Sequence, residues 1–300
     1  MRRWLNGKEG PTAEPEELPS YHLPLNDLIE RRKKEYKRRS KAEDARSRIN
    51  VKVKTRGPYG ILFMGDPHLD DPGTDIGLIE KHIAITRKNP RITGVCVGDF
   101  INNWRGRLAH LHADQSTTAR DASRLTEWMI DNGEWACLIA GNHDIWSGED
   151  DPLRWLTRGI GSVYEWDEAK LAFTQGDDDP IYVTVRHAFK GYSIYNRAHG
   201  ATRAMRMGGT DDLYVAGHIH THAMYQEEDS GSGRIKRGLQ LASYKKIDDF
   251  ARSIGAARVR HGEAVLVVVD AASSAFGRVT PFWDIEKGEK YLDMLHGEGV

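Results

Sequence analysis

Residues 60–68 read GILFMGDPH, an apolar run of strand length followed at once by Gly-Asp-x-His. Two later stretches have the same order: residues 92–99 read ITGVCVGD, and residues 135–144 read WACLIAGNHD. Apolar residues at helical spacing separate these runs, first within residues 76–83 and then within residues 119–129. Strand–helix–strand order predicts parallel strands joined by right-handed crossovers. Ligands of open α/β sheets bind in the loops beyond the carboxyl ends of such strands.

The second half of the chain is predicted to be mostly β. Short runs rich in β-branched and apolar residues alternate with links rich in Gly, Asp and Ser. We expect strands at residues 171–174, 181–186, 213–216, 239–242 and 264–269, in a second sheet packed on the first. Residues 284–296 are expected to close the chain as a helix. Together the two halves predict an α/β protein.

The N-terminal part has a different character. Residues 1–23, with three prolines among acidic residues, predict an irregular leader. A helix is expected from Asn26 or Asp27, with Asp27 as its N-cap, to about Ile49. We therefore divide the chain into a leader with a basic helical arm, residues 1–55, and a main domain, residues 56–300.

The basic arm carries a charge that the whole chain conceals. Residues 30–49 hold ten Lys/Arg and four Asp/Glu, so this segment is at +6, while the complete chain is at -1. A cationic helix favours a polyanionic partner such as nucleic acid. The alternative is a solvated helix, or one that docks on the acidic body or on a partner subunit.

Composition sets the class of protein. The chain has 300 residues, of which 39% are hydrophobic and 29% charged. Its longest apolar run, residues 264–269, is far shorter than the roughly 20 residues that span a bilayer, and no secretory signal is visible. We expect a cytoplasmic protein with no membrane partner. Cys96 and Cys137 lie in apolar runs and are expected to be buried thiols.

Metal-ligating residue types directly follow five of the predicted strands. The segments are Gly65-Asp66-Pro67-His68, Gly98-Asp99, Gly141-Asn142-His143-Asp144, Arg186-His187 and Gly217-His218-Ile219-His220. Carboxylate, amide oxygen and neutral imidazole suit Mn²⁺, Fe or Zn²⁺, whereas Ca²⁺ prefers oxygen alone and structural zinc prefers thiolates. Where Asp66 and His68, or His218 and His220, leave a strand in extended geometry, both side chains of the pair point to one side.

These five segments resemble the motif series of the calcineurin-like metallophosphoesterases, D-x-H, GD, GNH[DE], H and GHxH, in the family's order. The resemblance covers about residues 58–270, and the stretch from Arg186 to Gly200 looks similar to bacteriophage-encoded members. It implies two packed mixed β-sheets flanked by helices, a four-layer α/β/β/α fold, here with an N-terminal helical extension.

The resemblance also implies a two-metal site. The implied ligands of one ion are Asp66, His68 and His220, those of the other are Asn142, His187 and His218, and Asp99 bridges the two. His143 would face the leaving group, oriented by Asp144. Mn²⁺ is the metal that we expect at both positions, with Fe, Zn²⁺, Ni²⁺ and Mg²⁺ as alternatives. The single-histidine motif could instead be His199, but His187 directly follows a predicted strand.

The implied activity is hydrolysis of a phosphoester by in-line attack of a metal-bridging hydroxide. We expect a phosphodiesterase, with a nuclease as one form of it. The alternatives are a phosphomonoesterase or small-nucleotide hydrolase with the same site, and a non-catalytic scaffold. A purple acid phosphatase is disfavoured because Asn102 stands where that group has a tyrosine, and residues 98–104 do not match the GDxVDRG of protein phosphatases.

Several residues outside the motifs have open assignments. Phe100 and Trp104 could stack on a base or pack under a lid. Other histidines are expected at the surface, as caps, or along the cleft: His22, His82, His261 and His296 for the first two roles, and His110, His112 and His222 for the third.

Overall fold

The computed structural model describes residues 21–146, 152–207, 209–253, 255 and 258–297, and the chain divides into two compact units at Ala45/Arg46. In the first unit, α1 (Leu25–Arg46) has no buried residue. It begins two residues before the expected cap at Asp27 and ends before Ile49, because residues 49–52 form a strand of the second unit. The leader expected at residues 1–23 lies almost wholly outside the described residues.

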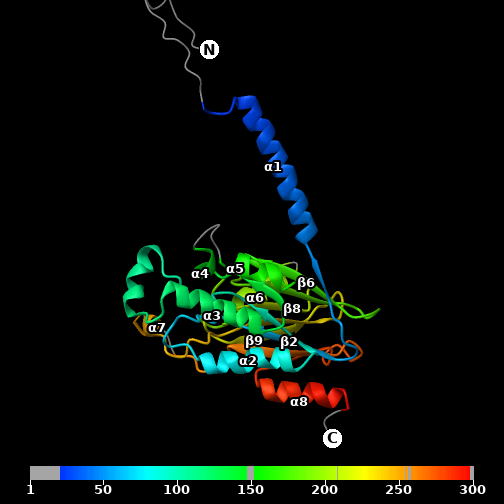
Figure 1. The fold of residues 1–300 in the computed structure, drawn as a ribbon. Helices are drawn as coiled ribbons and strands as arrows, with labels where there is room; N and C mark the ends of the chain where they lie inside the picture. Colours follow the sequence, from blue (N-terminus) through cyan, green and yellow to red (C-terminus); the bar gives the residue numbers. More distant parts are fainter. Residues whose placement is uncertain (1–20, 147–151, 208, 254, 256–257, 298–300) are drawn as a thin grey trace, which may run out of the picture. The chain divides into compact units, whose positions relative to one another are not determined.

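The second unit contains two six-stranded mixed sheets (Figure 1). The first sheet has the order β12-β11-β2-β3-β4-β5, and the second has the order β1-β6-β7-β8-β10-β9. The strands of the first are β2 (Tyr59–Met64), β3 (Ile92–Cys96), β4 (Trp135–Ile139), β5 (Val163–Glu165), β11 (Ala264–Val269) and β12 (Val279–Phe282). Those of the second are β1 (Ile49–Lys52), β6 (Glu168–Thr174), β7 (Ile181–Arg186), β8 (Leu213–Ala216), β9 (Ala223–Glu228) and β10 (Ile235–Gln240).

Strand β2 shows how the layers are built. Its side chains alternate between two apolar clusters: Ile61 and Phe63 pack between the two sheets, and Leu62 and Met64 pack under helices. Successive side chains of a strand point to opposite faces, so a strand covered on both faces must be apolar at every position. The unbroken run of residues 60–64 is therefore the pattern of a strand buried in the middle of a layered protein.

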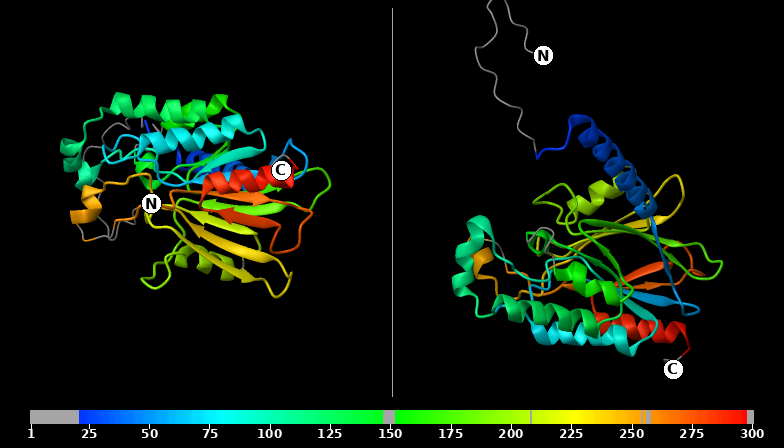
Figure 2. Two further views of the ribbon diagram at one scale, coloured as in Figure 1. Left: turned by 90° about the horizontal axis from the view of Figure 1, so that it is seen from below. Right: turned by 45° about the horizontal axis from the view of Figure 1, so that its top comes forward.

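Helices cover the outer faces of both sheets. On the first sheet lie α2 (Ile76–Lys88), α3 (Ala119–Asn132) and α8 (Ile285–Leu295), and on the second lies α6 (His199–Arg206). The left view of Figure 2 shows α2, α3 and α8 on one side of the strands and α6 on the other. Shorter segments complete the unit: η1 (Gly106–Asp114), α4 (Asn142–Ile145), α5 (Pro152–Leu156), η3 (Thr157–Gly159) and α7 (Asp249–Ser253). The expected four-layer α/β/β/α fold is confirmed.

Helix ends follow local chemistry. The Asp75 carboxylate accepts a hydrogen bond from Leu78 N at 2.9 Å and caps α2, and Asp284 caps α8 in the same way. Such caps satisfy N–H groups that have no partner within the helix. The helix expected at residues 284–296 is thereby confirmed. No helix within the described residues is long and apolar enough to cross a membrane, and both cysteines are free and buried, as expected.

Strand β11 corrects the predicted division of the strands. It was expected in the second sheet but pairs antiparallel with β2 in the first, with β12 beyond it. Its sequence AVLVVV is buried throughout, which suits an inner strand of either sheet. The second sheet is instead completed by β1, from the segment assigned to the arm, and by the edge strand β9.

The parallel strands place the predicted site. β2, β3 and β4 run parallel with Met64 opposite Cys96 and Cys96 opposite Leu138, so the loops that begin at Gly65, at Val97 and at Ala140 leave at one edge. In the second sheet β7 and β8 are also parallel, with Val185 opposite Val215. The loops after these two strands contain the remaining predicted ligands His187, His218 and His220.

Candidate metal centre

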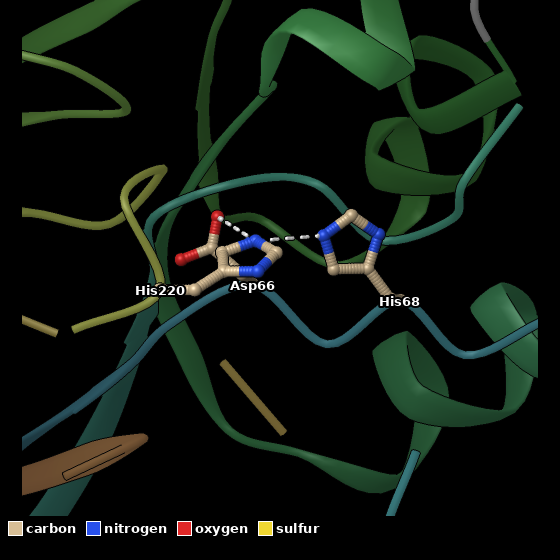
Figure 3. A group of neighbouring side chains, drawn as sticks. All are labelled: Asp66, His68 and His220. Carbon is tan, nitrogen blue, oxygen red and sulfur yellow. Dashed lines mark hydrogen bonds and ion pairs between the residues drawn. The ribbon is translucent and has the colours of Figure 1, made fainter. Parts of the chain in front are cut away.

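The five motif loops bring the predicted ligands together in two groups. One contains Asp66, His68 and His220, and the other contains Asp99, His187 and His218. Within each group one ligand atom of every residue lies within 4.8 Å of the others. Figure 3 shows the first group, whose members come from the loop after β2 and the loop after β8.

In the first group the imidazole of His220 stands between the other two side chains (Figure 3). Its Nε2 lies 3.2 Å from His68 Nε2 and 3.9 Å from Asp66 Oδ1. Asp66 is fully buried, and its two oxygens accept a hydrogen bond from the backbone N–H of His218 at 2.9 and 3.0 Å. The carboxylate thus also ties the loop after β8 to the loop after β2.

In the second group Nε2 of His187 contacts all the other members. It lies 3.0 Å from Asn142 Oδ1, 3.1 Å from His218 Nδ1 and 3.2 Å from Asp99 Oδ2. The other ring nitrogen, Nδ1, donates to the carbonyl of Val97 at 2.8 Å. This bond orients the ring, because a metal-binding histidine is held by the group that its second nitrogen contacts. The predicted Asn142 therefore joins this group.

Asp99 lies between the two groups. Its Oδ2 is 3.2 Å from His187 Nε2 and 3.9 Å from His68 Nε2. Its Oδ1 accepts the backbone N–H of His143 at 3.0 Å. One carboxylate oxygen is thus fixed by the chain, and the other faces members of both groups, which is the position expected of a bridging ligand.

The backbone at these residues is unusual. Left-handed φ values occur at Asp66 (22°), His68 (42°), Asp99 (55°), His218 (72°) and His220 (48°). Such values are uncommon in residues other than glycine and cluster at functional sites. The expected reason for convergence, extended geometry after each strand, is therefore wrong. Turning of the backbone also sends His218 and His220 to different groups.

The glycines before the motifs are needed for close approach. A Cβ at Gly217 would collide with the Asp66 carboxylate, and a Cβ at Gly141 would collide with Asp99. Gly98 has a φ of 104°, and a Cβ there would lie 2.9 Å from His187 Nδ1. Each glycine thus allows a ligand side chain of one loop to lie in close contact with the backbone of another loop.

The ionisable groups strongly affect one another. Burial raises the pKa of Asp66 to about 6, against the attraction of His220 and His187. Burial also disfavours charge on Asp99, but the neighbouring His187 holds the pKa of that carboxyl below its usual range. For His187, burial lowers the pKa and Asp99 more than offsets it, raising it to about 10. A cation bound between Asp99 and His187 would take the place of this proton.

His143 lies beside the two groups. Its Nε2 is 3.9 Å from Asp99 Oδ2, and its ring packs against Trp104 and Trp146 at 5.2 and 4.2 Å between centroids. Its Nδ1 donates to the carbonyl of Asn102. Burial lowers its pKa.

The expected role of Asp144 needs correction. Its carboxylate accepts the backbone N–H groups of Asp99 at 2.8 Å, Phe100 at 3.0 Å and Gly141 at 2.8 Å. The orientation of the His143 ring comes from the Asn102 carbonyl instead. Asp144 holds the loop of Asp99 against the loop of Asn142, because a carboxylate can accept several backbone donors.

Other predicted residues are placed as follows. His199, the alternative to His187, begins α6 on the outer face of the second sheet. Phe100 is buried, so it cannot stack on a base. His82 was expected at the surface or as a cap, but it is buried, with Nδ1 at 2.6 Å from Tyr244 Oη. His110 and His112 are exposed and do not line the cleft above the site, whereas His222 and His261 do.

The remaining two histidines agree with their expected roles. His22 is exposed. His296 is the C-cap residue of α8, and its Nε2 also lies 2.7 Å from the Pro58 carbonyl.

A cleft of about 980 Å³ opens above the two groups. Its floor includes His68, Asp99, His143, His218 and His220. Sequence reasoning missed several residues of its wall, which carry charge but belong to none of the motifs: Arg197, Lys245, Asp248, Arg258 and Arg260. Only their charge could have drawn attention to them.

No family model and no curated protein matches the chain. Solved structures with a similar fold include TT1561 of Thermus thermophilus, at 9% identity and a TM-score of 0.40, covering 75% of this chain and 98% of that one. A metallophosphoesterase from Sphaerobacter thermophilus has 14% identity, a TM-score of 0.38 and coverage of 80% and 94%. Calcineurin-like phosphoesterase YfkN from Bacillus subtilis has 13% identity, a TM-score of 0.35 and coverage of 81% and 100%. Likeness at this level says nothing about activity, so the function must be argued from the side chains.

Proposed function

We propose that the protein is a phosphoesterase that works with two divalent metal ions, and that it hydrolyses phosphodiesters. The observation that carries the proposal is the position of Asp99 Oδ2, which faces His187 at 3.2 Å and His68 at 3.9 Å. One carboxylate oxygen shared by two clusters of imidazole, carboxylate and amide donors is an arrangement suited to a dinuclear centre.

The residues fit such ions. His187 Nε2 faces Asn142 Oδ1 and Asp99 Oδ2, both of which are acceptors. A single proton on Nε2 is shared poorly between these oxygens, whereas a metal ion binds the nitrogen and both oxygens at once. The donor set favours Mn²⁺, Fe or Zn²⁺. In this assignment Asp66, His68 and His220 hold one ion, and Asn142, His187 and His218 hold the other.

Two divalent ions supply a water of lowered pKa and neutralise charge on the phosphoryl oxygens. His143 then acts on the leaving group. The Asn102 carbonyl holds the Nδ1 side of the ring and leaves Nε2 on the side of the cleft. In the doubly protonated ring Nε2 also carries a proton, and its delivery to the departing oxygen leaves a neutral ring with its proton on Nδ1. Such a transfer is worth about 10²- to 10⁴-fold in rate. Trp104 and Trp146 pack on the ring and limit its rotation.

The charge pattern of α1 supports a polyanionic substrate. Its glutamates pair within the helix, with Glu35 on Arg32, Glu30 on Lys33 and Glu43 on Arg39. Five further cations of the helix make no ion pair within the described residues, and these are Arg31, Lys34, Lys37, Arg38 and Lys41. At 3.6 residues per turn they fall largely on one side of the helix. We include sequence-independent binding of nucleic acid by this face in the proposal.

The test is a metal analysis followed by a substrate panel. Protein loaded with Mn²⁺ is assayed on bis(p-nitrophenyl) phosphate, on p-nitrophenyl phosphate and on linear DNA. We expect two ions per chain and turnover of the diester well above that of the monoester. Activity on the monoester alone would replace the proposal with a phosphomonoesterase. No turnover with Mn²⁺, Fe²⁺, Zn²⁺, Ni²⁺ or Mg²⁺ would point to a scaffold.

A further inference from the structure

One wall of the cleft has chemistry that the proposed hydrolysis does not use. Arg197, from the loop before α6, and Arg258 and Arg260, from the loop before β11, line the cleft together with Tyr192. All four are exposed, and the aromatic member, Tyr192, is 64% exposed. The groups of the candidate metal centre lie on the floor of the same cleft.

The carboxylates of the cleft do not neutralise this wall. Among the described lining residues they are Asp99 and Asp248. Asp99 faces the ligand groups, and Asp248 Oδ1 lies 3.2 Å from Lys245 Nζ. Lys245 is in turn held by Asp71 at 2.8 Å, so this lysine is already paired.

The three arginines keep their charge available. Arg258 uses Nε to donate to the Lys246 carbonyl at 3.1 Å, which leaves its terminal nitrogens for another acceptor. The side chains of Arg197 and Arg260 make no ion pair with the residues that the structure describes. Guanidinium groups bind phosphate in a planar, two-point geometry. The wall is therefore ready to take phosphate oxygens.

The size of the cleft indicates more than one phosphate. About 980 Å³ is at the upper end of ligand sites, which range over roughly 300 to 1,000 Å³. The floor needs one phosphoryl group, and the arginines lie on the wall. An exposed tyrosine beside cations is a typical platform for a nucleobase, because stacking accepts any base.

We propose that Arg197, Arg258, Arg260 and Tyr192 form a subsite for a single strand of nucleic acid, with a phosphate next to the scissile one on the arginines and a base on Tyr192. This inference rests on the proposed function and assigns its substrate class. It makes the scissile bond an internal linkage of an oligonucleotide rather than the ester of a small phosphate.

The test compares the wild-type chain with R197A/R258A/R260A, with Y192A and with the matched control R252A. Arg252 lies on α7, is exposed, pairs with Asp249 and does not line the cleft. The measured quantity is kcat/KM for a thymidine trinucleotide relative to that for bis(p-nitrophenyl) phosphate. We expect this ratio to fall at least about 5-fold in the triple variant and in Y192A, since the loss of stacking on one aromatic residue costs about 5-fold or more. R252A should keep the wild-type ratio.

A binding measurement judges the subsite separately from turnover. Fluorescence anisotropy of a labelled trinucleotide in EDTA gives the dependence of affinity on salt. The slope of log K against log salt should be smaller by about 0.7 in the triple variant, the contribution of the one phosphate that the arginines no longer neutralise. Unchanged ratio and unchanged slope overturn the inference while diester hydrolysis stands. If no diester is hydrolysed, the proposed function fails and the slope alone decides, with an unchanged slope rejecting the subsite.

Discussion

Asp248 Oδ2 lies 3.7 Å from Nδ1 of His220, whose Nε2 faces His68 and Asp66. The other oxygen of Asp248 is held by Lys245, which also contacts Asp71. Asp71 in turn accepts a hydrogen bond from the Asn102 side chain at 2.9 Å, and the Asn102 carbonyl receives His143 Nδ1. A chain of polar contacts therefore joins His220 of the first ligand group to His143, the candidate general acid.

Asp248→Asn should weaken Mn²⁺ binding by about 10- to 100-fold, the usual cost of losing a carboxylate that orients a metal-binding histidine. Isothermal titration of the metal-free protein measures it. The matched control is Asp249→Asn, whose side chain is 83% exposed and pairs with Arg252. Equal affinities in both variants would remove Asp248 from the support of the metal centre.

Asp99→Asn should lose both ions. The variant keeps the shape of the side chain but replaces the charged Oδ2 that faces His187 and His68 with a neutral amide. Elemental analysis after dialysis against Mn²⁺ should then find far fewer than two ions per chain, and diester hydrolysis should vanish. A preparation with two ions and wild-type turnover would show that Asp99 does not bridge.

His143→Ala should behave in the opposite way. Its ring nitrogens contact the Asn102 carbonyl and face Asp99 from outside the two ligand groups, so both ions should remain. Turnover should fall by about 10²- to 10⁴-fold through loss of proton transfer to the leaving oxygen. A diester with a good leaving group such as p-nitrophenolate should suffer least. A variant that loses metal together with activity would make His143 a ligand.

How far the sequence predicts the fold is seen by comparing β2 with β11 and β9. An unbroken apolar run bounded by glycine identified β2, because a strand covered on both faces cannot carry polar residues. The same property hid the sheet to which β11 belongs, since six buried apolar residues fit either sheet. β9 was missed because its sequence AMYQEE is half exposed at a sheet edge and contains no apolar run. Pairing between strands distant in sequence is decided by packing, not by local pattern.

The sequence likewise predicts one part of the candidate site and not another. Its ligand types follow from motif chemistry, and the structure brings Asp66, His68 and His220 together as the resemblance implied. The turned backbone at these residues has no signature in the sequence, because Asp-x-His suits extended geometry equally well. Asp248 pairs with His220 from 28 positions away, in a loop that carries no motif, and only the folded chain shows this pairing.

The buried His82 should make stability depend on pH. Burial lowers its pKa to about 4, from 6.5 in the unfolded chain. Below pH 6.5 the unfolded chain binds a proton at His82, whereas the folded chain binds it only near pH 4. The contribution of neutral His82 to stability is therefore complete above pH 6.5 and is lost as the pH falls. At about 1.36 kcal/mol per pKa unit, the free energy of unfolding falls by at most about 3 kcal/mol through this group. Urea unfolding between pH 7.5 and 4.5 should show a steeper decline for wild type than for His82→Gln.

His112, which is exposed on η1, supplies the control for that experiment. His112→Gln should keep the wild-type decline, because it also removes one histidine but leaves the buried His82 in place. Parallel curves for wild type and His82→Gln would mean that His82 is protonated within the fold.

The two sets of cations on α1 should differ in their effect on polyanion binding. Lys34, Lys37 and Lys41 have no ion-pair partner within the described residues, whereas Arg32, Lys33 and Arg39 each contact a glutamate of the same helix. Replacing the first three with glutamine should lower the salt slope for duplex DNA by about 0.9 for each phosphate that the helix no longer neutralises. Replacing the second three removes the same charge but leaves three glutamates unpaired. Both variants lose three positive charges, so a model in which only net charge matters predicts equal decreases of the slope.

Direct binding of phosphates by the unpaired lysines predicts the larger decrease of the slope in the first variant. Equal decreases in anisotropy titrations from 50 to 200 mM salt would mean that α1 attracts DNA only through its net charge.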